Sequence, residues 1–288
     1  MIGQMRFTLL FILLWLCQPI LAGYQFHKAE PEDVEWYVES SPLACRLIHE
    51  IPAYGEAVFF RKIKTELEFI VNVTKAAKRP DNAQLRSLPP EWKHYSFAKD
   101  FGLIPVVEGN SPFYLSHSWA SKMIVELKEG MDLHINYRDL FDGEDEIDIR
   151  ISGLNFSAAW EEFQDCEKGL LKVGFTDVMQ AVIQYKPGQT EVSTDAMREL
   201  DQMIEYLKAD PSVRRVRIDG YTDSKGLQRV NLKVARDRAA AVKDYFRSKG
   251  IKANRITIYA HNEMEGKFSN RTAAGRNKNR RVEVKLIR

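Results

Sequence analysis

Three polar residues in the C-terminal half have the types and spacing of a site for a charged ligand. Asp223 closes the segment 218–223 (Ile-Asp-Gly-Tyr-Thr-Asp), where a predicted strand leads into a loop. Asn231 and Arg238 follow seven residues apart, close to two helical turns, so they share one helix face. A carboxylate, an amide and a guanidinium can therefore converge on a ligand that carries both an amine and a carboxylate. The alternative is a structural ion pair that caps the helix.

Strands and helices that alternate after about residue 175 would position these groups. The apolar patterns predict strands over 178–185, 213–219, 255–260 and 282–287, and helices over 194–208 and 227–249. Ser193 is a suitable cap for the first helix, and Gly250 follows the second helix where a stop is expected. The order βαβαββ predicts an α+β domain with one mixed sheet and helices packed on it.

The preceding part of the chain has the pattern of an all-β domain, a barrel or a sandwich. Apolar and polar residues alternate over 146–152 and 66–73, and 123–127 is a third predicted strand. Clusters of Gly, Pro, Asn and Asp separate such runs. No segment of helical period is evident before about Ala158. We expect two domains, 23–166 and 167–288.

The first 22 residues resemble a secretory signal peptide. Arg6 gives a positive start, residues 7–16 are apolar apart from one Thr, and the small residues Ala22 and Gly23 follow at the expected cleavage site. The apolar run is about half of the ~20 residues that a membrane span needs. We therefore expect a cleaved, exported and soluble protein, with an uncleaved N-terminal anchor as the alternative.

Three cysteines constrain the exported chain. If Cys17 leaves with the signal, Cys45 and Cys166 remain, and one intramolecular pairing is possible. We predict a Cys45–Cys166 disulfide that ties the start of the β-rich domain to its end. Two free thiols are the alternative, and two lone cysteines make a poor metal site.

Charge is divided unequally between the two halves. The whole chain has a formal net charge of +2, which argues neither for nor against an anionic partner. Residues 1–166 carry 16 basic and 25 acidic side chains, whereas residues 167–288 carry 26 and 15. The basic half raises the possibility of nucleic-acid binding, but an exported chain would seldom meet nucleic acid, and anionic wall polymers explain the charge equally well.

Signatures of catalysis are missing from the sequence. It has no His-Glu-x-x-His helix and no Gly-x-Ser-x-Gly turn. The acids Asp142, Glu144, Asp145 and Glu146 have the character of a solvated loop and strand edge. We expect no enzyme activity, no metal and no cofactor.

Residues 213–287 resemble the OmpA-like peptidoglycan-binding family. Three motifs in order carry the likeness: Gly220-Tyr221-Thr222-Asp223, then Asn231 with Arg238-Ala239-x-x-Val242, then Asn279-Arg280-Arg281-Val282. The resemblance implies that Asp223 holds the amino group, and Arg238 the carboxylate, of diaminopimelate in a peptidoglycan stem peptide. Asn231 and Arg281 fall on further pocket positions of that family.

The N-terminal half resembles the MotY family of flagellar motor proteins. The likeness rests on the segments 41–52 and 155–166, each of which contains one of the two cysteines. It implies a subunit of the periplasmic T ring that associates with MotX and the flagellar basal body. The C-terminal domain would then hold the ring to peptidoglycan so that stators are retained around the rotor. A generic OmpA-domain wall anchor outside the flagellum is the alternative.

Overall fold

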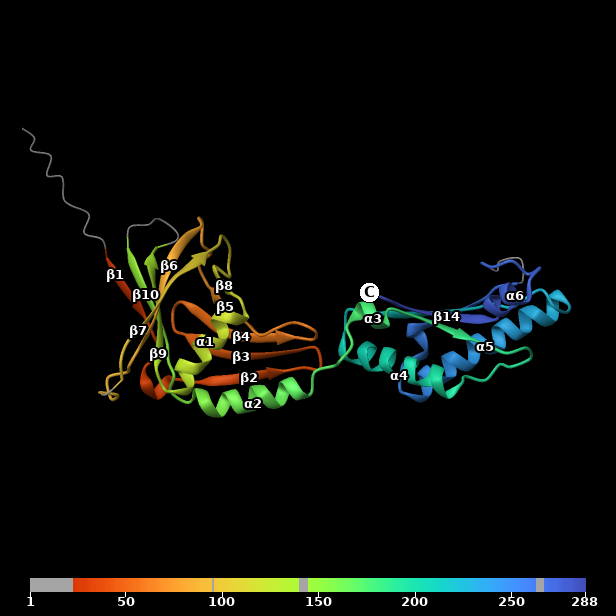
Figure 1. Ribbon diagram of the computed structural model, residues 1–288, viewed down its shortest axis with the longest axis horizontal. Coiled ribbons are helices and arrows are strands. Elements are labelled where there is room, and N and C mark those ends of the chain that lie inside the picture. The colour runs from red at the N-terminus through yellow and green to blue at the C-terminus, as the bar shows by residue number, and fades with distance from the viewer. Residues whose placement is uncertain (1–22, 95, 140–144, 263–266) are drawn as a thin grey trace, which may run out of the picture.

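The computed structural model describes residues 23–94, 96–139, 145–262 and 267–288, which form two lobes (Figure 1). One hydrophobic core is built from residues between Ala29 and Phe163, and a second from residues between Val178 and Leu286. The predicted signal peptide lies outside the described residues. Within the described ranges, no helix combines the length and the apolar character needed to cross a bilayer.

Two five-stranded sheets form the N-terminal lobe. Each has a linear strand order, so within the described residues neither closes into a barrel. One sheet, in spatial order, contains β1 (Tyr24–His27), β10 (Glu146–Ile151), β9 (Asp132–Arg138), β6 (Asp81–Leu88) and β7 (Lys99–Val106). The other contains β2 (Trp36–Ser40), β3 (Ala44–Ile51), β4 (Gly55–Lys62), β5 (Glu68–Val73) and β8 (Phe113–Leu115).

A single apolar core joins these sheets, as the β-rich prediction requires. Buried side chains of both sheets belong to it, including Leu47 and Val71 from one and Leu85 and Ile149 from the other. The short helix η1 (Pro31–Asp33) links β1 to β2, and α2 (Phe156–Lys168) packs against β2 and β3. Phe156 meets the Trp36 ring edge-on, with 4.9 Å between ring centroids.

The strand predicted over 123–127 is wrong, because these residues belong to helix α1 (His117–Lys128). Met123, Ile124 and Leu127 are buried at a spacing of three to four residues, while Val125 is half exposed. A helix therefore precedes Ala158, contrary to the prediction. The all-β class of the lobe nevertheless holds, because its core is built on the two sheets.

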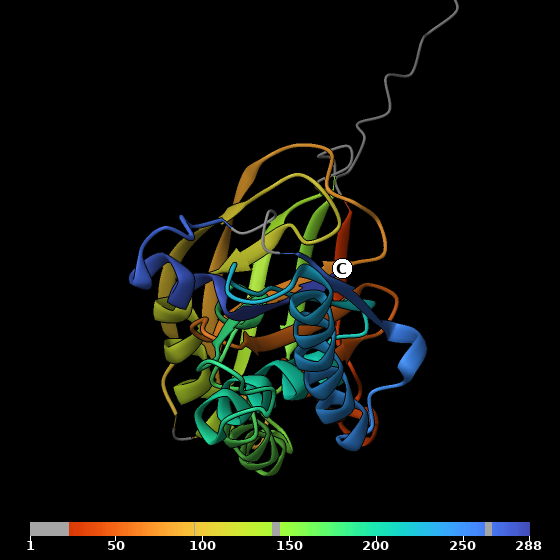
Figure 2. The same ribbon diagram turned by 90° about the vertical axis from the view of Figure 1, so that its right-hand side faces the viewer.

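The C-terminal lobe is the predicted mixed sheet with helices. Its strand order is β11-β14-β12-β13, with β12 and β13 parallel and β14 antiparallel to both β11 and β12. Helices α4 and α5 lie on the same side of this sheet (Figure 1), and Figure 2 shows the lobe end-on. The Ser193 side chain caps α4, as predicted, by accepting from the Ala196 backbone N–H. The elements are α3 (Phe175–Val178), β11 (Gln180–Gln184), α4 (Thr194–Ala209), β12 (Arg215–Gly220), α5 (Gln228–Ser248), η2 (Ala253–Arg255), β13 (Ile256–Ala260), α6 (Ala273–Asn279) and β14 (Arg281–Ile287).

The predicted disulfide is present in the structure. Cys45 on β3 and Cys166 near the end of α2 are bonded, with 6.0 Å between their Cα atoms. The bond fixes the last turn of α2 to the sheet, immediately before the chain passes into the C-terminal lobe. The Lys64–Asp177 ion pair and a hydrogen bond from Leu171 N to Pro42 O (2.9 Å) follow just beyond it.

Candidate ligand-binding site

An open cavity of about 410 Å³ lies in the C-terminal lobe where the predicted site residues meet. The loop after β12, the first half of α5, the turn after β11 and helix α6 form its walls. Three of the four residues predicted for ligand binding line it: Asp223, Asn231 and Arg238. The remaining lining residues are Pro187, Gly188, Thr222, Lys225, Val230, Val234, Ala273, Arg276 and Arg280.

Arg238 is a fixed, buried cation in this wall. Its side chain is almost completely buried, and its guanidinium carbon lies 4.8 Å from the centre of the Tyr185 ring. Within the described residues its guanidinium donates only to backbone carbonyls: Nε to Gln189 O at 2.9 Å, with longer bonds to two others. Burial lowers the pKa of Arg238 from its ordinary value, yet an arginine remains charged at neutral pH. No carboxylate of the described residues is therefore hydrogen-bonded to this positive charge.

Asp223 pairs with a different arginine. Its Oδ2 accepts from Arg280 Nη1 at 2.6 Å, and its Oδ1 accepts from the Lys225 backbone N–H at 3.1 Å. Both side chains of the pair are nearly buried, which strengthens the attraction compared with a surface pair. Asp223 and Arg238 thus face one cavity without forming the structural ion pair that was the alternative explanation.

Asn231 supplies an unpartnered polar group. It is 95% buried, and its Nδ2 atom makes no hydrogen bond in the structure. Buried amide groups are nearly always bonded, because leaving one unsatisfied costs about 1–3 kcal/mol. An orphan amide in the wall of an open cavity is therefore suited to a ligand's oxygen.

Close packing at Gly220 sets the separation of these groups. A Cβ at this position would lie 2.2 Å from the Ala235 carbonyl oxygen, so only glycine lets the end of β12 approach α5 this closely. Asp223 follows from β12, whereas Asn231 and Arg238 stand on α5. The contact at Gly220 therefore brings the loop carboxylate close to the helix residues.

Positive charge is in excess around the cavity. Among the described residues, its lining includes the cations Lys225, Arg238, Arg276 and Arg280 and one carboxylate, that of Asp223. Since Arg280 already neutralises Asp223, the remaining cations favour a ligand with more carboxylates than amines. Lys225, Arg276 and Arg280 were not among the residues predicted for ligand binding. Arg280 stands in the third family motif beside Arg281, whereas the basic charge of this half was the general signal for the other two.

The structure does not bring Arg281 into the cavity, and the neighbouring Arg280 lines it instead. Successive residues at the start of a strand point to opposite faces of a sheet. Arg281 is buried on the face away from the helices, where its guanidinium carbon lies 3.9 Å from the centre of the Tyr221 ring. Its Nε donates to Glu283 Oε1 at 2.8 Å.

Two buried carboxylates organise this helix-free face. Burial opposes the ionisation of Asp219, but hydrogen bonds from Arg217 and His261 keep its pKa below the ordinary value. Burial also opposes the ionisation of Glu283, and hydrogen bonds from Lys267 and Arg281 lower its pKa in the same way. The face is therefore held by ionised carboxylates in the folded protein.

The acids considered for catalysis form no site in the described chain. Asp142 and Glu144 lie outside the described residues, while Asp145 and Glu146 stand at the start of β10, bound to or paired with neighbouring strands. Across the parts of the chain with described coordinates, no group of three or more His, Cys, Asp and Glu could hold a metal ion.

Each of the two lobes matches a different family of known proteins. Residues 27–172 match the model of the MotY N-terminal domain, and residues 184–280 match that of the OmpA family. The chain is 27% identical to the sodium-type flagellar protein MotY of Vibrio parahaemolyticus over 268 residues, which cover 91% of this chain and 90% of the relative.

Two further relatives match the C-terminal lobe alone. Outer membrane protein A of Bordetella avium is 40% identical over 88 residues, 31% of this chain and 45% of that protein. The peptidoglycan-binding protein ArfA of Mycobacterium bovis is 38% identical over 85 residues, 30% of this chain and 26% of that protein. The first family model spans just over half of the chain, and the second spans most of the remainder. The chain therefore belongs to the MotY family of flagellar proteins and carries a C-terminal domain of the OmpA family.

Proposed function

We propose that this protein is a non-enzymatic, periplasmic component of the flagellar motor that grips peptidoglycan with its C-terminal cavity. The observation that carries the proposal is the buried Arg238 guanidinium, which has only backbone carbonyls and a ring as partners in a cavity rich in cations. A relative of this lobe is named a peptidoglycan-binding protein, which supports the same ligand.

The geometry suits the diamino acid of a peptidoglycan stem peptide. Its free carboxylate would take the fixed guanidinium of Arg238, and its amine would approach Asp223. Because Asp223 is paired with Arg280 in the unliganded protein, the amine would share or displace that partner. The Asn231 amide would donate to a ligand oxygen and so gain the hydrogen bond that it lacks.

The N-terminal lobe would dock on the basal body. We propose a place in the T ring with MotX as a partner, so that the ring retains stators indirectly through its hold on the wall. The match of residues 27–172 to the MotY N-terminal domain supports this role over that of a generic wall anchor. Nucleic acid is not a proposed partner.

Co-sedimentation with purified peptidoglycan sacculi tests the wall-binding part. Arg238→Ala and Asp223→Ala should each abolish sedimentation while circular dichroism stays native. Arg198→Ala and Asp195→Ala remove exposed charges of the same types from α4 and should sediment like the wild type. Wild-type binding by both cavity variants would refute the site.

A cellular assay tests the motor part separately. Cells that carry only the Arg238→Ala protein should swim poorly and lose polar stator foci, as cells without the gene should. Normal swimming of the deletion strain would refute the motor role and leave wall binding unaffected.

A further inference from the structure

We propose that the chain is cut between Ala22 and Gly23 and that the new terminal ammonium of Gly23 forms an ion pair with Asp145. In the structure the Gly23 backbone nitrogen already donates to Asp145 Oδ1 at 2.8 Å. The preceding sequence has an apolar run followed by Pro19 and a small residue, Ala22, directly before this bond, with Ile20 at the third position before it. Sequence pattern and folded geometry thus point to the same bond.

The Asp145 carboxylate is oriented toward strand β1. Its second oxygen, Oδ2, accepts from Gln25 Nε2 at 2.5 Å, so both carboxylate oxygens face the first residues of the described chain. The Glu146 backbone N–H donates to Gly23 O at 2.9 Å and begins the parallel pairing of β1 with β10. Gly23 is therefore held on two sides.

Glycine at position 23 lets the Asp145 carboxylate approach closely. A Cβ atom there would lie 2.7 Å from Asp145 Oδ1 and 3.1 Å from its Cγ. A larger residue would require the Asp145 side chain to shift. A terminus one residue earlier or later would place a different group beside Asp145.

Cleavage changes the character of this contact. A signal peptidase adds water across the Ala22–Gly23 bond: the water oxygen joins the Ala22 carbonyl carbon, the C–N bond breaks, and the Gly23 nitrogen takes up protons. A neutral amide N–H becomes an ammonium with three donors. A hydrogen bond between two charged groups is roughly twice as strong as one between neutral groups.

Further charged residues lie near this end of β1. Asp148 accepts from the Tyr24 hydroxyl at 3.1 Å and lies 3.0 Å from His134 Nδ1. Glu146 stands opposite Arg138 on β9, and Arg86 is the nearby cation that acts on Tyr24. Among these acids, Asp145 is the one whose carboxylate already accepts from the Gly23 nitrogen.

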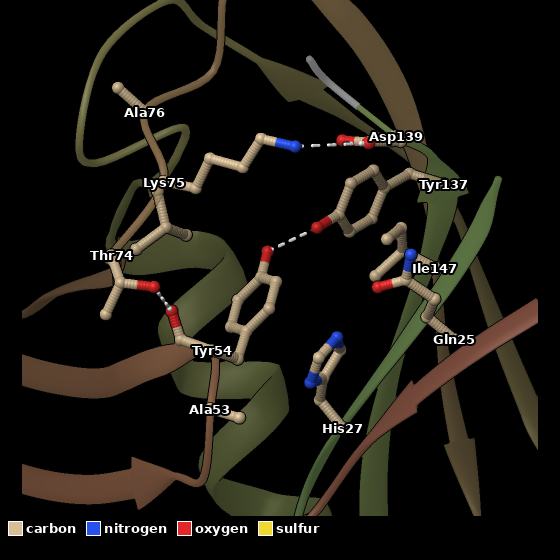
Figure 3. Close-up of a pocket in the computed structure, with 11 residues that line it drawn as sticks. Gln25, His27, Ala53, Tyr54, Thr74, Lys75, Ala76, Tyr137, Asp139 and Ile147 are labelled. Atoms are coloured by element: carbon tan, nitrogen blue, oxygen red, sulfur yellow. Dashed lines mark hydrogen bonds and ion pairs between the residues drawn. The ribbon is translucent and has the colours of Figure 1, made fainter. Parts of the chain in front are cut away.

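The ion pair would hold an edge strand that has little else to fix it. β1 has four residues, lies at the end of its sheet, and buries none of its side chains fully. Gln25 and His27 nevertheless line a cavity of about 130 Å³ together with Tyr54 and Tyr137 (Figure 3). An ion pair at Gly23 would therefore hold in place the strand that carries these two lining residues.

The test compares three forms of the 23–288 chain: one that begins at Gly23, one with an extra alanine before it, and one acetylated at Gly23. At pH 7 the N-terminal lobe of the first form should melt about 2–4 °C above the other two. An ammonium paired with a carboxylate has a raised pKa in the fold, so the advantage is complete below the unfolded pKa of about 7.7–8.0. The difference in melting temperature should disappear as the pH rises through the pKa of the Gly23 ammonium in the folded protein.

Asp145→Asn should remove the difference between the three forms, whereas Glu146→Gln, next in the chain, should preserve it. Terminal sequencing of protein exported in cells should give Gly-Tyr-Gln. A different terminus, or identical melting of the three forms at pH 7, would overturn the proposal.

Discussion

At the scale of residues, the cavity contains one ion pair, one guanidinium and one amide. Asp223 and Arg280 neutralise each other. Within the described parts of the chain, Arg238 bonds to no carboxylate and the Asn231 amide nitrogen to no acceptor. A ligand amine must therefore compete with Arg280, while a ligand carboxylate meets Arg238 without displacing a protein carboxylate. We infer that carboxylate recognition contributes more to affinity than amine recognition.

Asn231→Leu separates binding from stability. Leucine has a similar volume and removes an amide whose burial is uncompensated, so the stability of the C-terminal lobe should stay the same or rise. Stem-peptide affinity should fall about 2–10-fold, because one hydrogen bond is lost. Calorimetric titration and urea unfolding measure the two quantities. Asn82→Leu, exposed on the other lobe, is the control, and unchanged affinity of the Asn231 variant would exclude the amide from the site.

The paired carboxylates on the helix-free face predict acid sensitivity. Because the pKa values of Asp219 and Glu283 are lowered in the folded protein, their contribution is complete above the unfolded values of about 3.9 and 4.3. This contribution to stability is lost as the pH falls through the lower pKa values that the two carboxylates have in the folded protein. Urea midpoints of the C-terminal lobe should therefore drop between pH 5 and pH 3, and less steeply in Glu283→Gln. Equal slopes for both proteins would contradict this account.

Sequence spacing predicts part of the cavity. The seven-residue interval puts Asn231 and Arg238 on one helix face, and the strand end places Asp223 in the adjoining loop. Arg280 and Arg281 are adjacent, and the pattern cannot distinguish which of them points to the helices until the pairing of β14 is known. Lys225 and Arg276 reach the cavity through loop and short-helix geometry that has no periodic signal.

At the scale of elements, the approach of β12 to α5 sets the cavity. Gly220→Ala would force a methyl group against the Ala235 carbonyl and should lower the free energy of unfolding by about 1–3 kcal/mol. Widening the gap should also weaken stem-peptide binding. Gly169→Ala, at the end of α2 with ordinary helical φ, is the control for urea unfolding. Full stability and affinity of the Gly220 variant would show that the contact is unimportant.

The disulfide makes a second element-scale prediction. Cys45 and Cys166 are 121 positions apart, so their bond closes most of the N-terminal lobe into one loop. Cys45→Ser should lower the stability of that lobe by about 2–5 kcal/mol under oxidising conditions. Reduced wild type should approach the variant in melting temperature. Identical melting of the oxidised proteins would remove the stabilising role.

Helices and strands are predicted correctly where the periodic pattern of apolar residues is long and clear. Helices α4 and α5 and the strand β12 between them lie within a few residues of the predicted ranges, because each helix shows an apolar stripe bounded by a cap or a glycine. The short apolar run 123–127 fits a strand as well as a helix, which is why the strand prediction fails there. The whole of α1 spans little more than three turns, and its helical form is decided by tertiary packing against β5 and β9.

At the scale of the whole molecule, the charge division parallels the two lobes. The acidic half contains the MotY N-terminal domain, and the basic half contains the OmpA-family domain with its cationic cavity. The near-zero total charge conceals this separation. A lobe with excess positive charge would be attracted to the anionic cell wall, whereas an acidic lobe beside it would not compete for the same surface.

Titration of the 23–288 chain with a stem tripeptide that ends in diaminopimelate tests the central claim most directly. The matched ligand has the free side-chain carboxylate of that residue converted to an amide. We predict that the carboxylate form binds at least about tenfold more tightly, since a hydrogen bond between charged groups contributes about 1.5–3 kcal/mol, and that Arg238→Ala abolishes this preference. Equal affinity of the wild type for both peptides would contradict the account.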